Sequence, residues 1–191
     1  MLILASNSPR RKELLKGLGI PYDVLVIQGI DESYPDTLPA NEVAEYIARK
    51  KADAYRDIAP GNTVLTADTV VVCEDEILGK PKDHDDAVRM LHKLSGKTHQ
   101  VYTGVCLKFT QEGQSPLCKN RSFTVCTDVT FKVLSDEEIE HYVSVYKPFD
   151  KAGAYGIQEW IGYVGVTKLE GSYFNVMGLP VQRIFKEIRQ L

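Results

Sequence analysis

The chain has 191 residues, 43% of them hydrophobic and 26% charged, which is ordinary for a soluble globular protein and excludes disorder as its main state. Its formal net charge of −3 lacks the basic excess of most nucleic-acid binders, so we expect no nucleic-acid partner. No apolar run approaches the length of a transmembrane helix, so we expect no membrane partner. The length predicts a single domain over residues 1–191.

The first residues are apolar, but basic residues at 10–12 follow too soon for a signal peptide, which predicts a cytoplasmic protein. The four cysteines form no Cys-x-x-Cys pair, and no histidine stands at a zinc-ligand spacing from them. We therefore expect isolated thiols in a reducing compartment. A disulfide between Cys118 and Cys126 across a hairpin is a less favoured alternative.

Predicted strands and helices alternate in the first half of the chain. In order, they are a strand at 2–5, a helix from Ser8 to about 18, a strand at 22–27, an acidic loop at 31–39, a helix at 41–56, a strand at 63–73 and an amphipathic helix around 87–94. Ser8 is a favourable N-cap, Pro9 suits the first turn, and Gly19 is a plausible stop.

Longer adjacent strands are predicted in the second half. The elements are strands at 101–109 and 122–133, a helix opened by the capping box at 135–138, a Gly-rich loop with a short strand at 153–165, and a last helix with Val181, Ile184, Phe185 and Ile188 on one face. Early alternation followed by adjacent strands favours a mixed α/β sheet with helices on both faces.

The turn at residues 6–11 is a candidate phosphate site. Amide groups at a helix start attract anions, and Ser8, Arg10 and Arg11 add further donors there. A capped helix followed by a solvated basic turn would show the same pattern, so the turn does not establish phosphate binding by itself.

Two carboxylate positions stand out. Asp68 interrupts an apolar, β-branched segment, where aspartate is unfavourable and burial of its charge requires a partner or a metal. This placement favours a functional role over a bulge. Asp31 and Glu32 are adjacent on a loop, where they either bind a divalent cation or are simply solvated.

Three lysines lie near predicted turns, namely Lys51, Lys80 and Lys151, and each alone fits an ordinary surface lysine. A P-loop is excluded, because position 91 is leucine where that motif requires glycine. Hydrolysis of a phosphoanhydride needs positive charge around the phosphates, a carboxylate-held metal and a base that orients water. Together the candidates supply all three.

Six ordered segments resemble the Maf family of nucleotide pyrophosphatases. They are residues 5–11, 67–69, 79–81, 95–104, 150–158 and 178–180. The resemblance runs from residue 2 to about 182. It implies an α/β fold of the Maf and ITPase-like type, in which an elongated mixed sheet forms two lobes around a central cleft, and a homodimer. It also implies hydrolysis of nucleoside triphosphates to the monophosphate and pyrophosphate with Mg2+ or Mn2+.

The resemblance also implies roles for individual residues. Asp68 would be the general base, and Glu32 and Asp68 would hold the metal. The residues expected at the triphosphate are Ser8, Arg10, Arg11, Lys51 and Lys80, and those expected to close over the nucleotide are Lys151 and Gln158. Arg11, Thr69 and Gln158 match the branch that acts on dTTP and UTP.

Other interpretations remain open at this point. The chain could be a nucleotide-binding regulator of septum formation that need not hydrolyse its ligand, although a poised Asp68 speaks against it. It could also be a nucleic-acid binder, which the net charge disfavours, or an enzyme acting on another phosphate ester.

Overall fold

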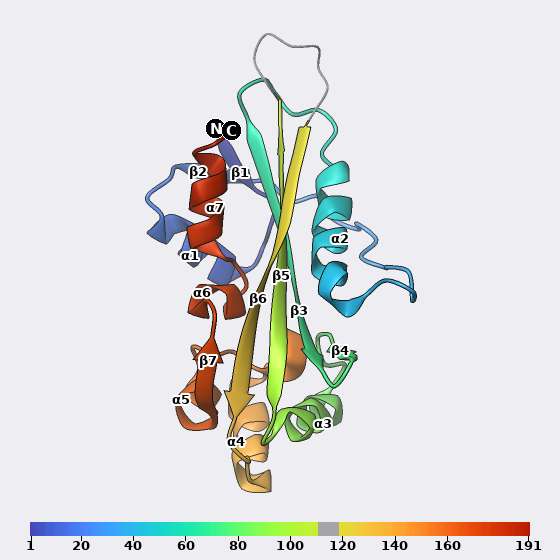
Figure 1. Ribbon diagram of the computed structural model, residues 1–191, viewed down its shortest axis with the longest axis vertical. Helices are drawn as coiled ribbons and strands as arrows, with labels where there is room; N and C mark the ends of the chain where they lie inside the picture. The colour runs from blue at the N-terminus through green and yellow to red at the C-terminus, as the bar shows by residue number, and fades with distance from the viewer. Residues whose placement is uncertain (111–118) are drawn as a thin grey trace. The chain divides into compact units, whose positions relative to one another are not determined.

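The computed structural model describes residues 1–110 and 119–191. The elements are β1 (Leu2–Leu4), α1 (Pro9–Gly17), β2 (Tyr22–Val24), α2 (Ala40–Asp53), β3 (Thr63–Cys73), β4 (Glu76–Leu78), α3 (His84–Leu94), β5 (Thr98–Phe109), β6 (Lys119–Phe131), α4 (Asp136–Tyr146), the 3-10 turn η1 (Ala152–Ala154), α5 (Trp160–Gly165), β7 (Val166–Glu170), α6 (Tyr173–Val176) and α7 (Val181–Ile188) (Figure 1).

The strands form one sheet in the order β2-β1-β3-β5-β6-β7, with β4 paired to β3. β1 runs parallel to β2 and β3, whereas β3 with β4 and β6 with β7 are antiparallel. The predicted mixed α/β sheet is therefore confirmed. None of the described helices is both long and apolar enough to span a bilayer. Cys73, Cys106 and Cys126 are free thiols, and Cys118 lies outside the described residues.

The chain divides into two compact units. Unit 1 comprises Met1–Asp68, Thr103–Val125 and Gly178–Leu191, and unit 2 comprises Thr69–Tyr102 and Cys126–Met177. Both units are discontinuous in sequence, because β3, β5 and β6 contribute residues to each. The central cleft implied by the resemblance stays a prediction.

Helices cover both faces of the strands in unit 1. Figure 1 shows α2 on one side of these strands and α1 and α7 on the other. At the start of α1, the Ser8 Oγ accepts a hydrogen bond from the Arg11 N–H at 3.5 Å. The helix ends before Gly19, whose φ of 68° lies in the left-handed region. The predicted cap and stop of this helix are thus confirmed.

Helix α2 approaches β5 unusually closely at Gly104. A Cβ atom at that position would lie 2.2 Å from the backbone carbonyl carbon of Ala44 and 2.2 Å from the backbone nitrogen of Glu45. A second contact ties α2 to β3, where the Thr66 hydroxyl donates to the Ala48 carbonyl at 2.6 Å. The absence of a side chain at Gly104 therefore sets the position of α2, including Lys51 in its last turn.

The core of unit 2 contains a buried histidine. His99 is fully buried, its Nε2 lies 2.7 Å from the Tyr155 hydroxyl, and its ring meets Phe131 edge-on. Burial lowers the pKa of His99 from 6.5 to about 4. The neutral imidazole is therefore the form that the folded chain accommodates at neutral pH.

The stability of the protein should consequently fall on mild acidification. The unfolded chain protonates His99 near pH 6.5, whereas the folded chain resists until near pH 4, so protons favour unfolding across that window. We expect the free energy of unfolding to drop by about 1.4 kcal/mol per pH unit there. Urea denaturation at closely spaced pH values measures the slope. The slope of the unfolding free energy against pH should be smaller in His99→Gln and unchanged in Tyr155→Phe, which keeps the histidine. Equal slopes in the wild type and in His99→Gln would contradict the assignment of the slope to His99.

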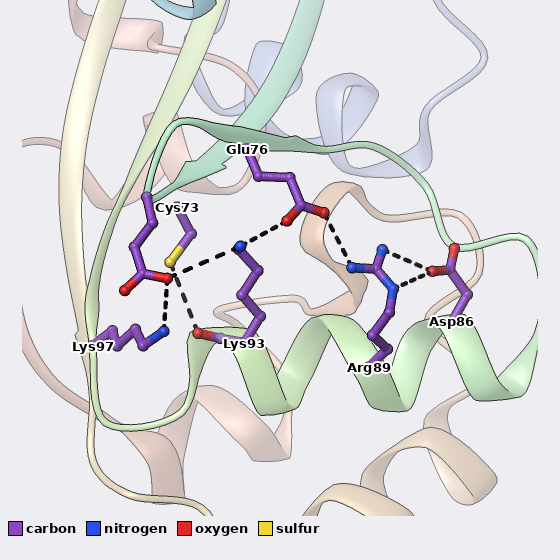
Figure 2. A network of polar contacts seen from close by, with 7 residues as sticks. Cys73, Glu76, Asp86, Arg89, Lys93 and Lys97 are labelled. Atoms are coloured by element: carbon purple, nitrogen blue, oxygen red, sulfur yellow. Dashed lines mark hydrogen bonds and ion pairs between the residues drawn. The ribbon is translucent and has the colours of Figure 1, made fainter.

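A chain of surface ion pairs joins the β3–β4 hairpin to α3 in unit 2 (Figure 2). Charges alternate along it in the order Lys97, Glu74, Lys93, Glu76, Arg89 and Asp86. The Lys93 Nζ lies 2.6 Å from Glu76 Oε2, and this contact lowers the pKa of Glu76. Single surface pairs add little stability. Two of these pairs join Glu76 of β4 to α3, and β4 ends directly before Gly79 and Lys80.

The structure corrects three predictions. The segment at 153–165, expected to be loop and short strand, contains η1 and the helix α5, and the strand begins only at Val166. The strand expected at 22–27 ends at Val24. In α7, Phe185 is exposed beneath the Arg189 guanidinium, while Glu187 is buried and pairs with Arg183 at 2.6 Å.

Candidate active site

Lys51 joins the two predicted metal ligands in unit 1. Its Nζ lies 2.7 Å from Asp68 Oδ1 and 3.1 Å from Glu32 Oε1. Lys51 and Asp68 are mostly buried, each with 15% of its side chain exposed, whereas Glu32 is 53% exposed. Sequence reasoning selected these three residues separately, and the structure brings them together.

The loop that carries Glu32 is held by the neighbouring lysine of α2. Lys50 Nζ lies 2.7 Å from Asp31 Oδ2 and 2.9 Å from the Ser33 carbonyl oxygen. Asp31 also accepts the Ser33 N–H at 2.9 Å, and the Lys50 and Ser33 contacts lower the pKa of Asp31. Two consecutive helix residues thus bind two consecutive loop carboxylates, which places Glu32 beside Lys51.

Arg11 is clamped beside the strand that carries Asp68. Its Nε donates to the Gly178 carbonyl at 2.8 Å, and its Nη1 donates to the Ala67 carbonyl at 2.8 Å. Burial lowers the pKa of Arg11 while the nearby Asp68 raises it, and a guanidinium stays charged at neutral pH. The arrangement keeps a positive charge next to Asp68.

The remaining predicted residues of unit 1 lie at the start of α1. Ser8 is the N-cap, and its backbone N–H donates to Ser6 Oγ at 3.2 Å. Arg10 is half-buried one residue before Arg11. The turn therefore has the helix start and basic side chains that suit an anion.

Two predicted residues converge in unit 2, at the loop that follows α4. Lys151 is buried, and its Nζ pairs with Asp150 Oδ1 at 2.7 Å and with Glu159 Oε1 at 3.1 Å. A Cβ atom on Gly156 would lie 3.0 Å from Lys151 Cε and 3.2 Å from Gln158 Nε2. Gln158 Oε1 is buried and has no hydrogen-bond partner among the described residues.

The other two predicted residues of unit 2 lie on or after the hairpin strands. Thr69 is half-buried in β3, directly after Asp68. Lys80 is exposed after β4, and the preceding Gly79 carbonyl accepts the Gly153 N–H at 3.1 Å. This bond ties the Lys80 turn to the start of the loop that carries Lys151.

Sequence reasoning missed Glu159 and Tyr142 as members of this group. Glu159 pairs with Lys151 and accepts a hydrogen bond from the Tyr142 hydroxyl. A tyrosine on the apolar face of a helix was the available signal, because a buried hydroxyl needs a partner. Its partner, however, lies 17 residues away, beyond the reach of local patterns.

The carboxylates of unit 1 suit a cation that is shared with a phosphate substrate. Magnesium in nucleotide enzymes is typically bound by one or two carboxylates together with substrate phosphates. Glu32 and Asp68 supply two carboxylates around one ammonium nitrogen. Within the described ranges no three acidic, histidine or cysteine side chains gather as an all-protein metal site. Two carboxylates are the number that such a shared cation typically takes from the protein, so Glu32 and Asp68 fit it.

The chain belongs to the Maf family, because a family model described as "Maf-like protein" matches residues 1–191. It is 59% identical over 191 residues to a protein of Phocaeicola vulgatus named dTTP/UTP pyrophosphatase, with 100% of this chain and 95% of that protein covered. A Bacteroides thetaiotaomicron protein of the same name is 54% identical, with 100% and 95% covered. Among solved structures, the Ham1 protein of Staphylococcus aureus matches with 16% identity and a TM-score of 0.47 over 97% of this chain and 98% of that one.

Proposed function

We infer that this chain hydrolyses nucleoside triphosphates, dTTP and UTP foremost, to the nucleoside monophosphate and pyrophosphate. The observation that carries the inference is the full-length similarity to proteins named dTTP/UTP pyrophosphatase. The cluster of Glu32, Lys51 and Asp68 supports it, since it combines acidic and basic groups of the kind this reaction needs. The similarity to named enzymes does not favour the regulator without hydrolysis.

In the mechanism that we propose, Asp68 acts on the attacking water. Lys51 binds Oδ1 of the carboxylate at 2.7 Å, and we assign the other oxygen, Oδ2, to the water. Asp68 takes a proton from the water while the water oxygen bonds to the α phosphorus. The bond between the α phosphorus and the oxygen that bridges it to the β phosphate breaks, and pyrophosphate leaves. Arg11, Arg10 and the amides at the start of α1 would bind phosphate oxygens.

We assign the metal to Glu32 and Asp68, with Mg2+ or Mn2+ as the expected ion. When bound, the ion would supply positive charge to the phosphate oxygens. Lys51 is placed to counter the charge of both carboxylates when no substrate is present. Lys80 would meet the charge of the departing pyrophosphate, while Lys151 stays beside Gln158 in the loop expected to close over the nucleotide.

Gln158 is our candidate for recognition of the base. Its amide offers one donor and one acceptor, which match the O4 and N3–H groups of uracil or thymine. The buried and unpartnered Oε1 supports this role, because an unsatisfied buried acceptor costs about 1–3 kcal/mol until a donor reaches it. Arg11 and Thr69 complete the set that the resemblance links to these two nucleotides.

We also propose a homodimer working in the cytoplasm. The dimer follows from the resemblance to the Maf family, whose members are commonly dimers, and the location is the expectation already stated from the sequence. Light scattering coupled to gel filtration checks the dimer, and a monomer at micromolar concentration would contradict it.

The reaction is tested by pyrophosphate release from dTTP, UTP, CTP, GTP, ATP and 7-methyl-GTP. Each nucleotide is assayed with Mg2+, Mn2+ or EDTA. We expect metal-dependent release that is strongest with dTTP and UTP. Strong release from another nucleotide would support the hydrolysis but overturn the assignment of Gln158, Arg11 and Thr69 to recognition of uracil and thymine. Binding without release from any nucleotide would overturn the proposed hydrolysis.

A further inference from the structure

Three polar side chains of unit 2 meet above the backbone of Gly156. A Cβ atom there would lie 3.0 Å from Glu159 Cδ, 3.0 Å from Lys151 Cε and 3.2 Å from Gln158 Nε2. A methyl group there would require these three side chains to shift by a few tenths of an ångström. Glu159 is thus next to both loop residues assigned to the nucleotide, although neither the family motifs nor the mechanism above gives it a role.

Tyr142 fixes the Glu159 carboxylate from the protein interior. Its ring is fully buried in α4, and its hydroxyl donates to Glu159 Oε2 while accepting the Gly156 N–H at 3.0 Å. Burial, with a further contribution from Glu159, raises the pKa of Tyr142, so the hydroxyl remains a donor at physiological pH. The other carboxylate oxygen, Oε1, pairs with Lys151 at 3.1 Å. Both oxygens of Glu159 are therefore held.

The Gln158 amide lies beside this fixed carboxylate, since both border the same point above Gly156. Of the two ends of that amide, the nitrogen Nε2 is turned toward the point above Gly156 that Glu159 also borders. A negative charge attracts the amide NH2 group and repels the amide oxygen. The buried Oε1 is consequently left to accept from a ligand.

The direction of this amide decides which pyrimidine fits. Uracil and thymine present an N3–H donor beside the O4 acceptor, whereas cytosine presents an N3 acceptor beside its N4 amino donor. If the Gln158 amide can rotate by half a turn, it can pair with uracil or thymine and also with cytosine. If the amide is held in one orientation, with its oxygen toward the base N3, it pairs only with uracil and thymine.

We propose that Glu159, held by Tyr142, is a positioning residue that fixes the direction of the Gln158 amide and thereby favours uracil and thymine over cytosine. The inference rests on the proposed function, because it assumes that Gln158 meets the base. It adds a specificity device built from two residues that need not touch the nucleotide.

The main test is Glu159→Gln, which keeps the shape but removes the charge. The ratio of kcat/KM for dTTP to that for CTP should fall about tenfold, because one buried hydrogen bond is worth about that factor. Turnover of CTP should stay the same or rise. A loss of equal size for both nucleotides would indicate a merely structural role and overturn the proposal. Glu140→Gln is the matched control, since Glu140 lies on α4 with partners His84 and Ser144.

A second variant acts through the hydroxyl alone. Tyr142→Phe keeps the ring that stacks on Tyr146 at 5.1 Å but releases Glu159 and the Gly156 N–H. We expect the dTTP-to-CTP ratio to fall in the same direction by less than in Glu159→Gln, because Lys151 still binds the carboxylate. Tyr146→Phe removes a hydroxyl one turn further along α4 and should leave the ratio unchanged. An unchanged ratio in Tyr142→Phe would overturn the part assigned to Tyr142.

Binding in EDTA separates this proposal from the proposed hydrolysis. Trp160 is the only tryptophan in the chain and follows Glu159 directly, so its fluorescence can report the dissociation constants of dTTP and CTP. If the wild type binds dTTP more tightly than CTP but releases no pyrophosphate, the proposed hydrolysis is wrong, and the positioning role of Glu159 is judged from the preference for dTTP over CTP in binding. A smaller preference in Glu159→Gln than in the wild type supports that role. An unchanged ratio, or a wild type without preference in binding and turnover, overturns it.

Discussion

Replacement of Asp68 by asparagine should lower kcat for pyrophosphate release from dTTP by about a thousandfold or more, since a general base contributes about 10²–10⁴-fold and the same carboxylate is assigned to the metal. Asparagine keeps the size of the side chain and can still contact Lys51, but it cannot take the proton of the attacking water. The dissociation constant of dTTP, measured by fluorescence in EDTA, should change little. Rapid-quench and steady-state assays with Mg2+ measure kcat.

Asp128→Asn is the control for a general effect of removing a carboxylate from a strand. Asp128 also lies in a strand, β6, and accepts from Gln100 Nε2 at 3.0 Å. Asp128→Asn should therefore retain kcat. Turnover near the wild-type value in Asp68→Asn would show that another group activates the water. A variant that no longer binds dTTP would show that Asp68 serves binding instead.

Gly104→Ala should damage both stability and activity. The added methyl group would stand 2.2 Å from the backbone of α2, so the helix must move away from β5. We expect the free energy of unfolding to fall by about 1–3 kcal/mol, as for other overpacked cores. Displacement of α2 also moves Lys51 relative to Asp68, and misplacement near 1 Å can cost about a hundredfold in kcat/KM. Guanidinium denaturation and pyrophosphate release measure the two effects.

The control for that substitution is Gly17→Ala in the last turn of α1. Apart from its chain neighbours and the backbone of its own helix, no heavy atom of the described residues lies within 4 Å of a Cβ built there, and alanine is favoured over glycine in helices by about 1 kcal/mol. Stability should thus be equal or slightly higher, with activity unchanged. If Gly104→Ala behaved like Gly17→Ala, the close approach of α2 would not be what sets Lys51 in place.

The accurately predicted features of the fold depend on local chemistry. The Ser8 cap and the capping box at Ser135 and Glu138 could both be predicted from the sequence, because their bonds join residues three positions apart. Helix α5 could not be predicted, since its glycines suggested a loop. Gly162 is required there because a Cβ would lie 1.8 Å from the Ile157 carbonyl oxygen, a contact that exists only in the folded turn.

In the candidate site, too, local sequence features were predicted and contacts between distant residues were not. Asp68 was identified from the cost of placing a charge in an apolar strand, and Lys51 and Glu32 were selected largely through the family resemblance. The sequence could not reveal that Lys51 touches both carboxylates, because the three residues come from a helix, a loop and a strand. Glu159 was overlooked for a similar reason, as its partner Tyr142 belongs to the preceding helix.

The make-up of unit 1 has a consequence for synthesis on the ribosome. Its parts are drawn from both ends of the sequence and from the middle. Arg11 is bound to Gly178, and Arg121 pairs with Glu187 at 3.2 Å. These bonds can close only after the last fourteen or so residues, 178–191, have left the exit tunnel. During translation the growing chain therefore carries an unfinished unit 1, in which Arg11 lacks its bond to Gly178, until residues 178–191 have emerged.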